Sequence, residues 1–231
     1  MADLVNTYRA ERLRTNAAVS RATVRAWDRL HLEQGEAITE TLRLVEAGQA
    51  RAVQLADGYL AARRRQARAG SSAPAGLDAD RYTVARLRRA DAREVYSRPF
   101  GALAGQLAQG SPLPAALASG RASVARLALT DLQLAQTHAA RDWMAEPANQ
   151  VYGYERVLGG GESCPLCVVA SQQIYYREDL MPIHERCQCS VSPLFGEHPG
   201  GGNVPRERDS GVRVVDDPEI GPRLMGEGWA A

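Results

Sequence analysis

Hydrophobic positions in the first two thirds of the chain recur with the period of an α-helix. From Ala37 to Arg68 the apolar residues are mostly three or four positions apart and are separated by arginine and glutamate. They include Ile38, Leu42, Leu44, Val45, Val53, Leu55 and Leu60. Acidic residues come early in this stretch and arginines late, which is the order that the helix dipole favours. The pattern predicts one long helix.

Glycine, serine and proline interrupt the helical pattern at 70–76, which predicts a loop. A further helix, capped by Asp78 or Asp80, is predicted to run through Val95. Pro99 and the glycine two residues later are predicted to end it, with a shorter helical segment following.

Another helix is predicted to start at Ser111, where prolines occupy the first turn, and to continue to Met144. Residues 1–146 are therefore predicted to form a helical region with a break near 70–76.

The composition changes at Pro147, where helical periodicity stops and glycine, tyrosine and cysteine appear. Short strands are predicted at Val151–Leu158, Ile174–Tyr176 and Cys189–Ser192. Residues 147–196 are thus predicted to form a small α/β module, and 197–231 an extended tail with little capacity for a core. The fold class predicted for the whole chain is α+β.

Composition and charge exclude some classes of protein. Hydrophobic residues make up 45% and charged residues 24% of the 231, which is ordinary for a globular protein. No apolar run is long enough for a membrane helix, and no signal peptide is recognisable, so we expect synthesis in a cytoplasm and no membrane partner. Net charge is +6 over 1–146, −2 over 147–196 and −3 over 197–231, which permits contact of the helical region with nucleic acid.

All four cysteines fall in one short segment, together with a histidine. The pattern is Cys164-x2-Cys167, sixteen intervening residues that end at Pro182-Ile183, and then His184-x2-Cys187-x-Cys189. A C-x2-C turn places two thiolates at the separation that a tetrahedral ion needs, and sulfur with imidazole favours zinc. The five residues therefore predict a structural zinc site.

The residues leave the ligand set open. The first choice is Cys164, Cys167, His184 and Cys187, with Cys189 structural or an alternate ligand. A second possible set consists of the four cysteines, and in it His184 does not bind the ion directly. Two disulfides are the main alternative to a metal, and a redox-active C-x2-C is a third interpretation.

The segment from Tyr154 to Pro193 resembles the C-terminal domain of the phage Mu F-like family, the minor head or head morphogenesis proteins of tailed bacteriophages. The residues that carry the resemblance are Arg156-Val157, Gly161-Glu-Ser-Cys-Pro-Leu-Cys167, Ala170, Tyr175-Tyr176, His184-Glu-Arg-Cys-Gln-Cys189 and Pro193. In the family a basic residue usually precedes the last cysteine, whereas this chain has Gln188.

The resemblance implies a structural virion component present in few copies, associated with the portal protein inside the head and in contact with the major capsid protein. It also implies a role in handling double-stranded DNA during packaging or ejection. Arginines at Arg63–Arg68 and Arg86–Arg93 are candidate non-specific phosphate contacts, with solvated helix faces balanced by acids as the plainer interpretation.

Other function classes fit the sequence less well. A zinc-ribbon DNA-binding regulator is the alternative, but its zinc module should be basic, and 147–196 is acidic. A metallo-hydrolase lacks a recognisable motif; only Glu185, beside His184, could act as a base. A secreted toxin lacks a catalytic constellation. We therefore expect a protein that is not an enzyme.

Overall fold

The computed structural model describes residues 2–67, 75–158, 165–175 and 189–196, and the backbone of two strands at 212–217 and 221–226. The fold is α+β, mostly helical with a small antiparallel sheet, as predicted. The chain divides into two compact units. Unit 1 comprises Met1–Tyr59 and Pro74–Ala139, and unit 2 comprises Leu60–Ala73 and Ala140–Ala231. Unit 2 thus combines the end of one long helical stretch, from Leu60, with the chain from Ala140 onward.

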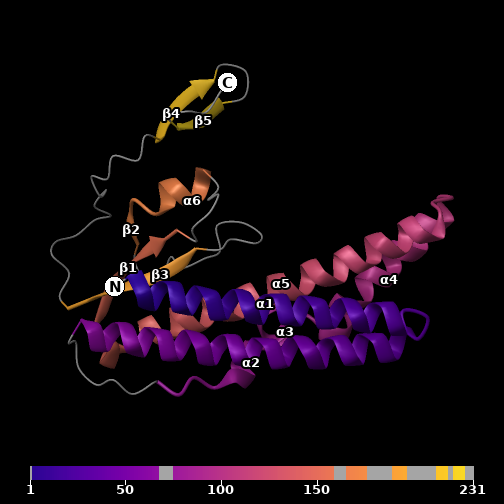
Figure 1. Ribbon diagram of the computed structural model, residues 1–231, viewed down its shortest axis with the longest axis horizontal. Helices are drawn as coiled ribbons and strands as arrows, with labels where there is room; N and C mark the ends of the chain where they lie inside the picture. The colour runs from indigo at the N-terminus through magenta and orange to yellow at the C-terminus, as the bar shows by residue number, and fades with distance from the viewer. Residues whose placement is uncertain are drawn as a thin grey trace. The chain divides into compact units, whose positions relative to one another are not determined.

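Two long helices form the start of the chain and lie side by side (Figure 1). They are α1 (Ala2–Leu30) and α2 (Gln34–Gln66), so the long helix predicted from the apolar spacing is confirmed. A tight turn joins them, in which the His31 amide donates to the Trp27 carbonyl at 2.9 Å. Glu36 lies in the first turn of α2 and three arginines in its last turn, as the helix dipole favours.

The prediction of one continuous helix from Asp78 or Asp80 through Val95 is wrong, because this segment forms three separate elements. These are a 3₁₀ turn, η1 (Ala79–Tyr82), and two helices, α3 (Val84–Arg88) and α4 (Ala92–Ala108). Arg89 adopts φ of 52°, which ends α3, and Asp91 then caps α4 by accepting from the Glu94 amide at 3.0 Å. Apolar periodicity continues across such a break and therefore does not reveal it.

The cap predicted at Asp78 is confirmed on the shorter element, because its side chain accepts from the Asp80 amide at 3.0 Å. Pro99, predicted to interrupt the helix, lies inside α4 and is buried. The helix predicted from Ser111 is confirmed as α5 (Leu113–Ala145).

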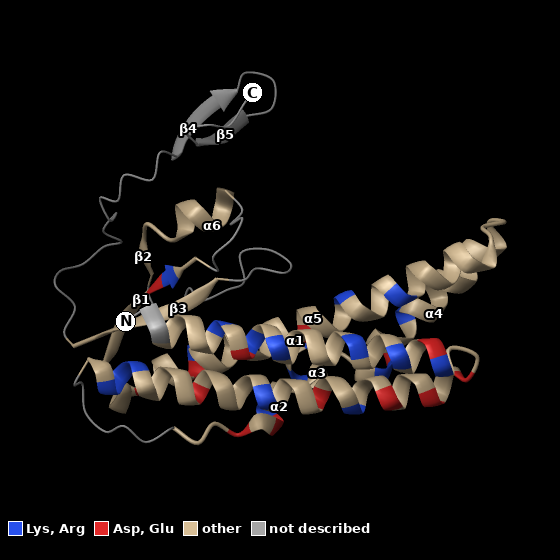
Figure 2. Ribbon diagram, in the orientation of Figure 1, with Lys and Arg blue, Asp and Glu red and all other residues tan. Residues whose placement is uncertain are grey.

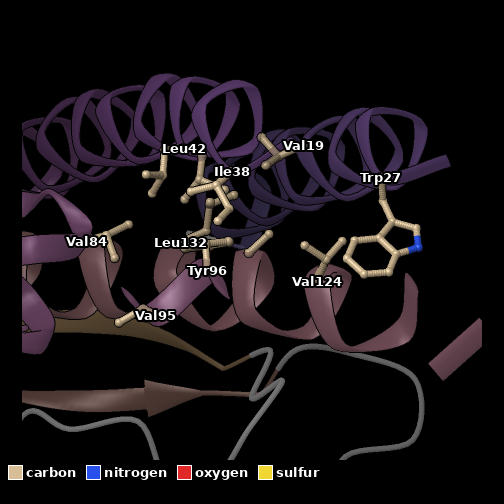
Figure 3. Packing of buried hydrophobic residues seen from close by; sticks show 11 residues of the cluster. Val19, Trp27, Ile38, Leu42, Val84, Val95, Tyr96, Val124 and Leu132 are labelled. Atoms are coloured by element: carbon tan, nitrogen blue, oxygen red, sulfur yellow. The ribbon is translucent and has the colours of Figure 1, made fainter. Parts of the chain in front are cut away.

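The core of unit 1 forms where α1, α2, α3, α4 and α5 meet (Figure 3). Its buried members are Val19, Trp27, Ile38, Leu42, Val45, Val84, Val95, Tyr96, Val124, Ala128 and Leu132. Two glycines allow the helices to approach. A Cβ at Gly48 would lie 2.6 Å from Val19, and one at Gly120 would lie 2.2 Å from the Trp27 ring. No side chain larger than hydrogen fits at either position without displacing a neighbour.

A polar cluster centred on Asp131 of α5 interrupts this apolar core. Asp131 is fully buried, and its carboxylate accepts from Arg88 Nε at 2.5 Å and from the Tyr96 hydroxyl at 2.7 Å. Gln49 of α2 donates to the Asp131 carbonyl at 3.3 Å. Burial raises the pKa of Asp131, while the hydrogen bonds from Tyr96 and the charge of Arg88 oppose the rise. The cluster thus joins α2, α3, α4 and α5.

The predicted tail contains a hairpin. Strands β4 (Val212–Asp217) and β5 (Gly221–Gly226) pair antiparallel, with Val212 opposite Gly226. The valines of β4 favour extended backbone, and a local pairing forms in the segment that we expected to be an extended tail. Among the described residues, the helices include none with the length and apolar character needed to cross a membrane.

We expect Asp131→Ala to lower the free energy of unfolding by about 3–5 kcal/mol, because it leaves a partly buried guanidinium and a buried hydroxyl without their acceptor. Asp28 is the matched control, since it pairs with Arg121 at 2.7 Å on the surface. Asp28→Ala should cost less than about 1 kcal/mol. Urea denaturation of both variants measures the difference, and equal losses would contradict the role assigned to Asp131.

Candidate metal centre

The sheet of unit 2 has three antiparallel strands in the order β2-β1-β3. They are β1 (Val151–Val157), β2 (Ile174–Tyr175) and β3 (Ser190–Phe195), so all three predicted strands are confirmed within a few residues. In the register, Tyr154 of β1 lies opposite Tyr175 of β2 and Pro193 of β3.

The structure describes two of the five predicted ligands. Cys167 lies in the short helix α6 (Pro165–Ala170), and its side chain is 3% exposed. Cys189 directly precedes β3 and is half-buried. The other three, Cys164, His184 and Cys187, fall outside the described residues. Within the residues that the structure does describe, no cluster of three or more His, Cys, Asp or Glu side chains forms a metal site.

The sheet topology bears on where the two cysteine-containing segments begin and end. Strand β1 ends at Val157, which pairs with Ser190 at the start of β3. Both β2 and β3 run antiparallel to β1, so both begin at the edge of the sheet where β1 ends. The connection from β1 to β2, which contains α6 and Cys167, therefore starts and finishes at that edge. Cys189 enters the sheet at the same edge.

An aromatic stack reinforces the pairing of β1 with β2. The rings of Tyr154 and Tyr175 stack with centroids 5.3 Å apart, and the guanidinium of Arg156 lies 5.8 Å from the Tyr175 ring centroid. Burial raises the pKa of Tyr175, and the charge of Arg156 opposes the rise. At Gly153 a Cβ would lie 2.7 Å from the Tyr175 carbonyl oxygen, so the close strand contact requires glycine. The two-residue strand β2 is thus held to β1 by side-chain contacts as well as by backbone pairing.

Two arginines from the end of α2 hold this sheet. Arg63 and Arg64 are each 8% exposed. Arg63 Nη2 donates to Ser192 Oγ of β3 at 2.6 Å, and Arg64 Nη1 donates to Asn149 Oδ1. Asn149 in turn donates to the Trp143 carbonyl at 2.6 Å. Within unit 2, the ends of α2 and α5 are therefore fastened to the sheet by charge-assisted hydrogen bonds.

These contacts correct the sequence-based interpretation of Arg63 and Arg64. Neither is on a solvated helix face, and neither guanidinium is exposed for phosphate contact. The spacing along α2 could have predicted their burial, because Arg63 and Arg64 follow the buried Leu60 by three and four positions and so lie on the same face of the helix. Of the second candidate group, Arg88 pairs with Asp131 and Arg93 donates to Thr39 Oγ1 at 2.9 Å.

The remaining histidines do not join the cysteines in the described structure. His31 makes a hydrogen bond of 3.1 Å through Nδ1 with the Trp27 carbonyl oxygen, and His138 is half-buried in α5. His198 and Glu185 fall outside the described residues.

Comparison of the chain with protein-family models, with curated proteins and with solved structures finds no match.

We expect Arg64→Ala to accelerate hydrogen exchange of the β1 and β3 amides by roughly 30- to 150-fold, which corresponds to about 2–3 kcal/mol of lost local stability. The reason is that a buried, charge-assisted bond to Asn149 is removed. Arg65→Ala is the matched control, because Arg65 is the exposed neighbour on the same helix. Arg65→Ala should change exchange less than about threefold. Similar rates in the two variants would show that Arg64 does not fasten the sheet.

Proposed function

We propose that the chain is a structural minor head protein of a tailed bacteriophage, of the Mu F-like type, and that unit 2 holds one zinc ion. The observation that carries the proposal is the sheet topology. The connection that contains Cys167 and the segment that enters β3 at Cys189 belong to one edge of the sheet. The Cys164/Cys167 turn and the His184–Cys189 segment are separated in sequence. They can share one ion only if they meet at the same edge of the sheet.

The donor set fits zinc by its chemistry. Cys164, Cys167, His184 and Cys187 are the ligands that we favour, with Cys189 as the alternate thiolate. Four protein ligands leave no open coordination position, so a zinc ion here would act as a cross-link. The sheet around it is small, and β2 has only two residues, which supports a need for such a cross-link.

Unit 1 supports a role in assembly. Arginine and acidic residues are intermixed along the length of its long helices α1 and α2 (Figure 2). In the proposal, which takes its partners from the family resemblance, unit 1 contacts the portal protein and the major capsid protein. The chain would be made in the host cytoplasm and then reside inside the head near the portal.

Contact with genomic DNA is a smaller part of the proposal. Arg63, Arg64 and Arg88 are engaged within the chain. Non-specific contact would fall to exposed arginines such as Arg65 and Arg86, and its affinity would drop steeply with salt.

We expect one zinc ion per chain in protein purified under reducing conditions, measured by elemental analysis. Cys164→Ser and His184→Ala should each remove the metal and lower the Tm, because loss of one ligand opens the site. His198→Ala is the control and should leave both unchanged. Cys187→Ser compared with Cys189→Ser identifies the fourth ligand. Metal-free protein whose Tm is unaffected by Cys164→Ser combined with His184→Ala would refute the zinc site.

We expect purified particles of the encoding phage to contain the chain in few copies, counted by quantitative mass spectrometry and located beside the portal by cryo-electron microscopy. Disruption of the gene should lower the yield of filled heads. Particles with normal yield and without the chain would refute the head-protein role. A sequence-specific operator bound by the purified protein would favour the regulator instead.

A further inference from the structure

One face of α1 carries a row of exposed arginines. Arg21, Arg25 and Arg29 follow one another at intervals of four residues, so they are neighbours on the same side of the helix. The rise of about 1.5 Å per residue places successive members about 6 Å apart along the axis. All three side chains are exposed, and Figure 2 shows basic residues recurring along this helix. We call these three residues the arginine row.

The arginine row is not balanced by acids of its own helix. Residues 12–27 of α1 include no acid. Asp28 is the acid nearest in sequence to Arg25 and Arg29, but its carboxylate accepts from Arg121 of α5, at 2.9 Å from Nε and at 2.7 Å from Nη2. Among the residues that the structure describes, none forms a hydrogen bond or an ion pair with the three guanidinium groups of the row. The row therefore presents three positive charges to solvent.

This arrangement differs from that of other exposed arginines on the two long helices. Arg14 pairs with Glu11 and Arg43 pairs with Glu40, in each case one turn away on the same helix. In the row, like charges occupy the i and i+4 positions instead, which destabilises a helix. No packing contact within the chain offsets that cost, because the side chains point to solvent.

The row ends at Arg29, where the surface becomes mixed in charge. Arg29 and Arg93 line an open groove of about 720 Å³ together with Glu36 and Glu40. The pKa of Glu40 is lowered, first by the hydrogen bond from Arg43 and to a smaller extent by the charges of Arg43 and Arg29. Two carboxylates make this groove unsuitable for an anion, so the candidate surface is the row and not the groove.

The composition of the face favours a polyanion over a protein partner. From Arg14 to Arg29 the exposed positions hold only arginine, alanine and aspartate. Protein interfaces centre on large apolar or aromatic side chains that become buried, and this face has none among its exposed positions. Guanidinium groups, in contrast, match phosphate oxygens with two parallel hydrogen bonds.

We propose that the arginine row binds the phosphate backbone of double-stranded DNA. The duplex carries one negative charge per about 1.7 Å of its axis, so a row about 12 Å long can reach a phosphate with each guanidinium. Contacts to the backbone alone do not read base sequence. This inference deepens the DNA-contact part of the proposed function and rests on it, because it names the surface that makes the contact.

Fluorescence anisotropy of a labelled duplex of arbitrary sequence tests the proposal with the full chain at about 20–200 mM NaCl. Three phosphate contacts should give a slope of about −2.7 for log K against log salt, so affinity should fall about 40-fold between about 50 and 200 mM. Arg21→Gln, Arg25→Gln and Arg29→Gln combined should bring this slope close to zero. The Tm of this row variant should be unchanged or higher, because two like-charge pairs are removed.

Arg51→Gln, Arg65→Gln and Arg86→Gln combined are the matched control. These arginines are also exposed and remove the same charge, but they are scattered over α2 and α3. The control should change the slope by less than about one unit. Equal losses in the two variants would attribute binding to net charge and overturn the proposal.

The remaining outcomes separate the row from the wider DNA contact. A row variant that binds like wild type, while the control loses binding, would overturn the row and leave DNA contact to Arg65 and Arg86. A wild-type chain that does not bind at about 20 mM salt would overturn both. Equal binding of poly-L-glutamate, lost in the row variant, would assign the row to an acidic protein and overturn the proposal. The zinc site and the position in the head are tested separately.

Discussion

The carboxylate of Asp131 sets the arrangement of the helices around it. Apolar contacts are not directional, so a core of valine, leucine and alanine tolerates small rotations and shifts of the helices. Hydrogen bonds have narrow geometry, and here one buried residue takes them from α2, α3 and α4 while it belongs to α5. The short helix α3 contributes Val84 to the main core and Leu87 to a second cluster around Val53 and Tyr82, and the bond from Arg88 adds a directional contact to these. If α3 packed in a different position, the guanidinium of Arg88 would lose its acceptor, the carboxylate of Asp131.

Long regular elements were predictable from sequence, and local breaks were not. The spacing of apolar residues over Ile38 to Leu60 gave α2, and alternation after Pro147 gave β1. The break between α3 and α4 depends on a single residue, Arg89, in left-handed conformation, which no periodic signal marks. Pro99 was misleading because a proline usually ends a helix, whereas here it lies within the span of α4 and its side chain is buried.

The candidate site was predictable in part for a similar reason. Cysteine and histidine spacing is a local property, and it predicts two ligand-bearing turns and a zinc ion, of which the structure describes only Cys167 and Cys189. The hydrogen bonds that hold the sheet to the end of α2, in contrast, join residues that are far apart in the sequence. Arg63 and Ser192 are 129 residues apart, and Arg64 and Asn149 are 85 apart. A charged run at the end of a helix is usually solvated, so only the continuation of the buried face past Leu60 distinguishes these arginines.

The discontinuity of unit 2 has a consequence for the order of events during synthesis. Its first part, from Leu60, leaves the ribosome long before β3, the strand that Arg63 contacts, has been translated. At about 5–20 residues per second, the guanidinium of Arg63 waits roughly 6–25 s for its hydroxyl acceptor on Ser192. During that interval the nascent chain carries an apolar and basic helix end without its sheet. Completion of this unit is therefore a late, long-range event, and the ribosome-bound intermediate is the form most in need of protection from premature contacts.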